Sequence, residues 1–144
     1  MTPACWTPPV RRWAAVGLLA AWFGSLGLPA AYLTDGDARP GLMLLFFGWV
    51  GVLMLQPAWL GNLLIWIVLP IVASSERPWK VTLRLCGGAL IICAIGALFF
   101  RDLPGDGGPN NVAAFGPGYY LWMIAVLGSG IAALITASVE TDTI

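Results

Sequence analysis

The sequence contains no histidine, and charged residues occupy only 10% of its 144 positions. Histidine is the commonest general base and the commonest metal ligand in proteins, so its absence disfavours most acid–base catalysis and metal binding. Lys and Arg together equal Asp and Glu in number, which leaves no basic surplus for binding nucleic acid. Soluble domains carry about 25% charged residues, so this deficit predicts a protein embedded in the lipid bilayer.

Cysteine is scarce and odd in number, with single residues at Cys5, Cys86 and Cys93. Three scattered cysteines do not form a disulfide framework. Cys86 and Cys93 would share one face of a helix, but roughly 10 Å of helical rise separates them, which is too far for a disulfide. We interpret both as small apolar packing residues.

Acidic residues are absent from every stretch long enough to cross a membrane. Proton-coupled pumps and ion relays usually need a carboxylate inside the membrane, so this absence disfavours them. A Ser or Cys nucleophile would also lack a histidine to activate it. We therefore expect no enzymatic activity, no catalytic residue, no metal and no cofactor.

A long uncharged run from Pro40 to Ser75 is the most distinctive stretch that is present. As one straight helix it would measure about 54 Å, against a hydrocarbon core of about 30 Å. The run must therefore break, tilt steeply or fold back. Gln56-Pro57 and Gly61-Asn62 lie near its middle and mark the expected break, because proline removes a backbone donor and clashes with the preceding turn.

The pattern predicts a single polytopic, all-α integral membrane domain over residues 1–144. Basic residues near membrane spans favour the cytoplasmic side. Arg11, Arg12 and the basic cluster at 76–84 therefore predict that both termini lie on the cytoplasmic side of the membrane. A single crossing between 40 and 76 then suffices, and the alternative with five transmembrane helices would move Arg77 and Lys80 outside. The expected segments are a tail at 1–12 and four spans at about 13–33, 56–74 with a shallow, re-entrant or bent 41–55 attached, 79–100 and 119–138.

Polar and aromatic residues around the expected break are the candidate interaction site. Gln56 and Asn62 are the only amides in the long run, and Trp49 and Trp59 flank the break. Two interpretations of the amides stay open. They form a polar binding site where a helix is unwound, or they make hydrogen bonds between helices.

Small residues at four-residue spacing predict close helix packing on three spans. Such rows let another helix approach closely. The rows are Gly17, Ala21 and Ser25; Ala89, Cys93 and Ala97; and Gly128 with Ala132.

Two stretches resemble small, uncharacterised bacterial four-helix inner-membrane proteins. GWVGVLMLQPAWLGN at 48–62 is similar to their second-helix region, and FGPGYYLW at 115–122 is similar to the entry to their last helix. The resemblance implies a bacterial inner-membrane location and no assigned activity.

Minimal loops, small-residue faces and eight tryptophans favour a non-enzymatic accessory or interaction subunit of a membrane assembly. Its expected partners are the lipid bilayer and other membrane protein subunits or further copies of itself, and not nucleic acid. Two alternatives stay open: an immunity-type protein that protects the membrane against a toxin, and a small oligomeric transporter that uses the Gln56-Pro57 break.

Overall fold

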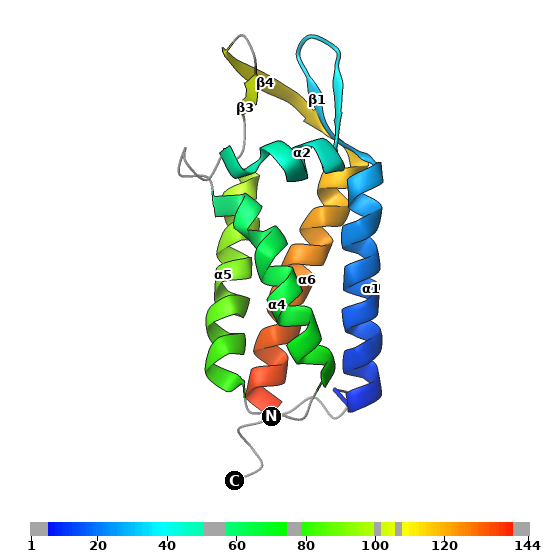
Figure 1. The fold of residues 1–144 in the computed structure, drawn as a ribbon, viewed down its shortest axis with the longest axis vertical. Helices are drawn as coiled ribbons and strands as arrows, with labels where there is room; N and C mark the ends of the chain where they lie inside the picture. Colours follow the sequence, from blue (N-terminus) through cyan, green and yellow to red (C-terminus); the bar gives the residue numbers. More distant parts are fainter. Residues whose placement is uncertain (1–5, 51–56, 75–78, 100–101, 106–107, 140–144) are drawn as a thin grey trace.

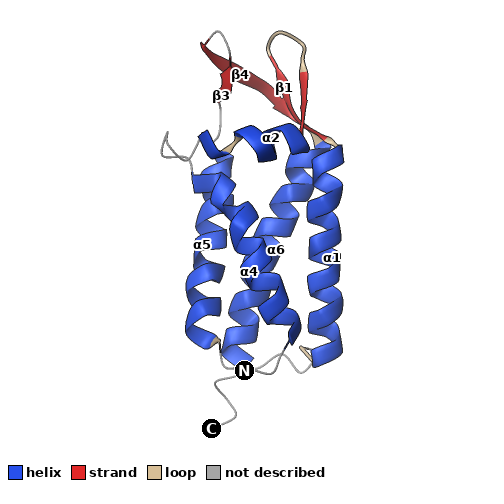
Figure 2. Cartoon of the chain, viewed as in Figure 1, coloured by secondary structure: helices blue, strands red, loops and turns tan. Residues whose placement is uncertain are grey.

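The computed structural model describes residues 6–50, 57–74, 79–99, 102–105 and 108–139, and for 102–105 and 108–111 it describes the backbone only. Four long helices run side by side as a bundle, and a small sheet projects from one end of it (Figures 1 and 2). The helices are α1 (Pro8–Gly27), α2 (Gly41–Phe47), the 3-10 turn η1 (Pro57–Trp59), α4 (Leu60–Ser74), α5 (Lys80–Leu98) and α6 (Pro117–Val139).

The first helix begins earlier and ends earlier than the predicted span at 13–33. Prolines at its first two positions are tolerated because the amides there have no partner inside the helix. The helix stops before Pro29, since a residue that precedes proline is driven out of the helical region. Leu28 is accordingly extended, with φ −98° and ψ 154°, and residues 29–33 form a strand.

The sheet is the main departure from the all-α prediction. Its antiparallel strands lie in the order β2-β1-β4-β3, and they are β1 (Pro29–Leu33), β2 (Ala38–Pro40), β3 (Asp102–Gly105) and β4 (Gly108–Phe115). Both segments that connect predicted spans on the sheet side, 34–40 and 101–118, contribute strands. Gly36 has φ +93° in the turn between β1 and β2, a conformation that glycine adopts without a steric penalty.

The long run from 40 to 75 is not one straight helix, because its first described helix, α2, does not run parallel to the bundle (Figure 1). The helix α2 has seven residues, about 10 Å of rise, and lies across the bundle end beside the sheet (Figure 1). Residues 51–56, with Gln56 among them, lie outside the described part of the chain. Past the break, η1 and α4 continue to Ser74, close to the predicted span at 56–74.

In the described part of the chain, three helical segments are long and apolar enough to cross a membrane: Pro57–Ser74, Lys80–Leu98 and Pro117–Val139. They match the predicted spans at 56–74, 79–100 and 119–138 to within two residues at each end. Large apolar side chains cover the outside of the bundle, for example Leu85, Ile92 and Phe99, which are all more than half exposed. Extensive apolar exposure of this kind is consistent with a membrane location.

Candidate functional site

Asn62 joins three helices at the sheet end of the bundle. It lies in the first turn of α4 and is 7% exposed. Its Oδ1 accepts hydrogen bonds from Trp22 Nε1 on α1, at 2.9 Å, and from Trp122 Nε1 on α6, at 2.8 Å. An indole N–H is a donor that usually finds a partner when buried, so one amide oxygen satisfies two tryptophans.

Trp59 fixes α2 above this network. Its indole donates a hydrogen bond of 2.8 Å to the carbonyl of Leu45. Gly48 allows the contact, because a Cβ there would lie 2.7 Å from the Trp59 ring. At the other end of α2, a Cβ on Gly41 would collide with the carbonyl oxygen of Ser25 on α1. Two glycines therefore let α2 lie directly on the bundle.

A cavity of about 110 Å³ lies beneath α2 and is partly open. Its wall combines α2 and η1 with the neighbouring ends of α1, α4, α5 and α6. Tyr119 closes part of that wall, because its hydroxyl donates to the carbonyl of Ala97 at 2.9 Å and its ring stacks on Phe115 at 4.1 Å. The lining residues are Ser25, Leu26, Gly41, Leu44, Leu45, Gly48, Ala58, Trp59, Asn62, Ala97, Tyr119 and Trp122.

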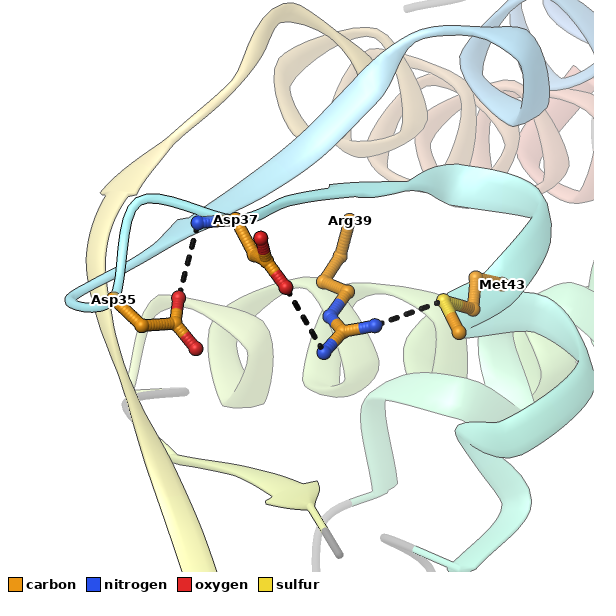
Figure 3. Close-up of polar contacts among 4 residues, drawn as sticks. All are labelled: Asp35, Asp37, Arg39 and Met43. Atoms are coloured by element: carbon orange, nitrogen blue, oxygen red, sulfur yellow. Dashed lines mark hydrogen bonds and ion pairs between the residues drawn. The ribbon is translucent and has the colours of Figure 1, made fainter.

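The polar groups between β1 and α2 form an exposed cluster (Figure 3). Asp35 accepts a hydrogen bond from the backbone N–H of Asp37 at 3.0 Å, and Asp37 lies 3.8 Å from the Arg39 guanidinium. Arg39 also donates to Met43 Sδ at 3.6 Å. Exposed ion pairs contribute about 0–1 kcal/mol, so the ion pair of this cluster adds little to the stability of the fold.

The structure brings together two of the four residues predicted as an interaction site. Trp59 and Asn62 both line the cavity, whereas Trp49 lies just after α2 and is 51% exposed. Gln56 is outside the described residues. Of the two interpretations of Asn62, hydrogen bonding between helices is seen directly and uses the amide oxygen. A binding role would fall to the amide nitrogen.

Sequence reasoning missed Trp22, Trp122 and Tyr119 as parts of this site. A usable signal was present for Trp22, which lies deep in the first apolar stretch, where its N–H needs an acceptor. Asn62 and Gln56, the only side-chain amides of the long run, were the two amide acceptors in that run that this indole could have been matched with.

The predicted packing rows are used unevenly. Gly17 is exposed and has no neighbour within 4 Å of an added Cβ, whereas a Cβ on Gly128 would lie 2.5 Å from Leu18. Among the remaining predicted residues, the buried ones are Ser25, Cys93, Ala97 and Ala132, and the half-buried ones are Ala21 and Ala89.

Arg11 is the buried charged residue of the described chain, at 8% exposure. Its Nε is fully enclosed and has no hydrogen-bond partner in the described residues. Nearby, the indole of Trp6 donates to Thr136 Oγ1 at 3.0 Å, which anchors the start of the described chain on α6. Within the described ranges, no three Cys, Asp or Glu side chains come together as a metal site would require.

Comparison with models of protein families, with curated proteins and with solved structures found no match to this chain.

Proposed function

We propose that this chain acts by binding another membrane protein, as a non-enzymatic accessory subunit of a membrane assembly. The observation that carries the proposal is the outward side of α2. Large apolar side chains form this α2 face, and each is between 38% and 66% exposed: Leu42, Met43, Phe46, Phe47 and the following Trp49.

The α2 face differs from the other exposed apolar surfaces of the molecule. Most of those surfaces lie on α1, α4, α5 and α6 along the length of the bundle, where lipid chains can cover them. The helix α2 instead lies across the bundle end, next to the exposed and charged β1–β2 turn (Figure 1). Aromatic residues and methionine are enriched at the centre of protein interfaces, which supports a protein partner at this position.

We expect the partner to be captured from the α2 face and not from the side of the bundle. A photoreactive benzoylphenylalanine at position 47, on the α2 face, should crosslink to one discrete protein in intact cells. The same probe at position 92, where Ile92 is 63% exposed on α5, is the matched control and should give only lipid adducts.

The double variant Phe46→Ser/Phe47→Ser should then reduce co-purification of the crosslinked protein about tenfold or more, since interface aromatics can each contribute 2 kcal/mol or more. Its unfolding midpoint should stay near that of the wild type, because both side chains are more than 60% exposed. Equal protein crosslinking from positions 47 and 92, or unchanged co-purification of the double variant, would contradict the proposal.

The same proposal includes four transmembrane helices, with α1 as the first, in a bacterial inner membrane. The helix α1 has 20 residues and runs beside α4 and α6 along the bundle. Arg11, Arg12, Lys80 and Arg84 all lie near the bundle end where α1 begins and α6 ends, opposite the sheet (Figure 1). Under the positive-inside rule, this distribution supports cytoplasmic termini and a sheet on the outer side.

Cysteine labelling in intact cells tests this orientation. In a variant without the three native cysteines, Asp35→Cys should react with a membrane-impermeant maleimide, because Asp35 is exposed on the sheet side. Trp79→Cys, at the exposed start of α5, should react only after the membrane is permeabilised. The reverse pattern would invert the topology. Labelling of both positions from outside would mean an even number of crossings between 35 and 79, which would contradict the single crossing proposed for this part of the chain.

A further inference from the structure

The amide of Asn62 has a defined orientation, because its two partners can only donate hydrogen bonds. Both are indole N–H groups, and both lie within 2.9 Å of the atom assigned as Oδ1. A flipped amide would place NH₂ against two N–H donors. The oxygen therefore faces the tryptophans with both lone pairs engaged, and the nitrogen Nδ2 faces away from them.

Nδ2 has no hydrogen-bond acceptor among the described residues, although Asn62 is buried, with only 7% of its surface exposed. Nδ2 also keeps some accessible surface. Among the described residues, the one side-chain nitrogen or oxygen that is both fully enclosed and without a partner is Arg11 Nε, so an unpartnered Nδ2 is not fully enclosed. Asn62 lines the cavity beneath α2, and because Oδ1 is engaged by the two indoles, Nδ2 is the polar side-chain atom of Asn62 that is left to bind a group in that cavity. Burying a polar group without a partner is costly, so a ligand that brings an acceptor to Nδ2 would remove that cost and gain affinity from it.

The other polar side chains of the cavity wall already have partners. Ser25 donates to the carbonyl of Trp22 at 2.6 Å, and Trp59 and Tyr119 donate to backbone carbonyls as described above. Among the described residues, none that lines the cavity is charged. The wall therefore suits an uncharged ligand that is mostly apolar and brings one acceptor for the amide nitrogen.

The size of the cavity limits what it can hold. An engineered apolar cavity of about 150 Å³ binds benzene, so about 110 Å³ accommodates a group near the size of one six-membered ring. A carbonyl oxygen fits the available donor better than a hydroxyl, because a hydroxyl would bring a proton that needs a further acceptor.

We propose that the cavity beneath α2 binds a carbonyl group carried on a neutral, apolar body, with Asn62 Nδ2 as the hydrogen-bond donor. Two sources share this chemistry: the ester group of a membrane lipid, and a free small ketone or quinone. The site is independent of the proposed partner surface, because the cavity lies under α2 and the partner surface is its opposite, outward side.

Nuclear magnetic resonance of the full chain in detergent micelles tests the site directly. The sequence has only four side-chain amides, at Gln56, Asn62, Asn110 and Asn111, so the Asn62 signal can be assigned from one Asn62 variant. Cyclohexanone should shift this signal saturably and bind about tenfold more tightly than methylenecyclohexane, which has the same shape without the acceptor.

A cavity-filling variant, Ala58→Leu, keeps Asn62 and should weaken cyclohexanone binding at least tenfold. The indole N–H signals of Trp22 and Trp122 report whether its hydrogen-bond network is intact, and Leu44→Phe serves as a second filling variant. Equal, unsaturable shifts from both probes would overturn the site, as would an undiminished shift in a folded filling variant.

Nanodiscs distinguish the two sources of the carbonyl. If a lipid ester occupies the cavity, the Asn62 amide signal should differ between nanodiscs of ester-linked and ether-linked diphytanoyl phosphatidylcholine, and Ala58→Leu should remove the difference. If the ligand is a free molecule, the two nanodiscs should give one signal, which added cyclohexanone then shifts. No response of the Asn62 amide in either arm would overturn the proposal.

Discussion

Replacing Asn62 with leucine is expected to destabilise the protein by about 2–4 kcal/mol. The change leaves two indole N–H groups, one buried and one partly buried, without their acceptor. An unsatisfied buried donor costs about 1–3 kcal/mol, whereas single hydrogen bonds measured in a membrane protein average about 0.6 kcal/mol. We expect the higher range because one residue serves two donors and joins α1, α4 and α6. Unfolding in mixed SDS micelles, followed by circular dichroism, measures the loss.

The neighbouring variant Leu63→Ala is the control, because Leu63 is half exposed on the same turn of α4. It should change the free energy of unfolding by less than about 0.5 kcal/mol in micelles. A double-mutant cycle that combines Asn62→Leu with Trp22→Phe isolates their hydrogen bond. The double variant should lose about 1 kcal/mol less unfolding free energy than the sum of the two single losses. Strict additivity would show that the Trp22–Asn62 contact adds no stability.

The bundle was largely predictable because each bundle helix carries a strong local signal. Apolar stretches gave the segments Pro57–Ser74, Lys80–Leu98 and Pro117–Val139 to within two residues at each end, and the break near Pro57 follows from the missing amide of proline. The sheet was not predictable in this way. Its central pairing joins Ala31 to Phe115, more than eighty positions apart, and β1 reads Pro-Ala-Ala-Tyr-Leu, without the alternation that marks a strand.

Only the part of the candidate site that η1 and α4 contribute was predictable from the sequence. Asn62 and Trp59 stand out as a polar and an aromatic residue near a break, and the structure places both on the cavity wall. Trp122 and Tyr119 begin a helix with an aromatic cluster, which is equally typical of an interface anchor. Their role depends on α6 reaching α4, and no local pattern specifies that contact.

The close packing of α5 on α6 was also hidden in the sequence. Ala89, Cys93 and Ala97 were predicted as the packing row of α5, yet a glycine outside this row, Gly87, also lies against α6. A Cβ on Gly87 would lie 3.1 Å from both the Gly130 carbonyl oxygen and the Ala133 Cβ. The adjacent Gly88 would meet nothing within 4 Å. Two consecutive glycines look alike in the sequence, and only the rotation of α5 about its axis separates their roles.

Gly87→Leu is therefore expected to destabilise the protein by about 3 kcal/mol or more, the upper part of the range for overpacked cores. The clash involves backbone and a packed Cβ, so relief requires α5 and α6 to separate and not merely a rotamer change. The same SDS unfolding measurement should show a much lower midpoint, and near the crossing the amide signals of both helices should shift.

Gly88→Leu is the matched control, since it makes the same chemical change one position along the helix. It replaces a helical glycine where there is open space, so it should be neutral or stabilise the helix by up to about 1 kcal/mol. A large loss at Gly88 with little loss at Gly87 would mean that α5 is rotated by about one residue. Equal losses at both would mean that backbone conformation, and not the contact with Gly130, limits substitution here. Only a selective loss at Gly87 agrees with a glycine-mediated contact between α5 and α6, since Gly87 and Gly88 differ in what an added side chain would meet and not in the chemical change.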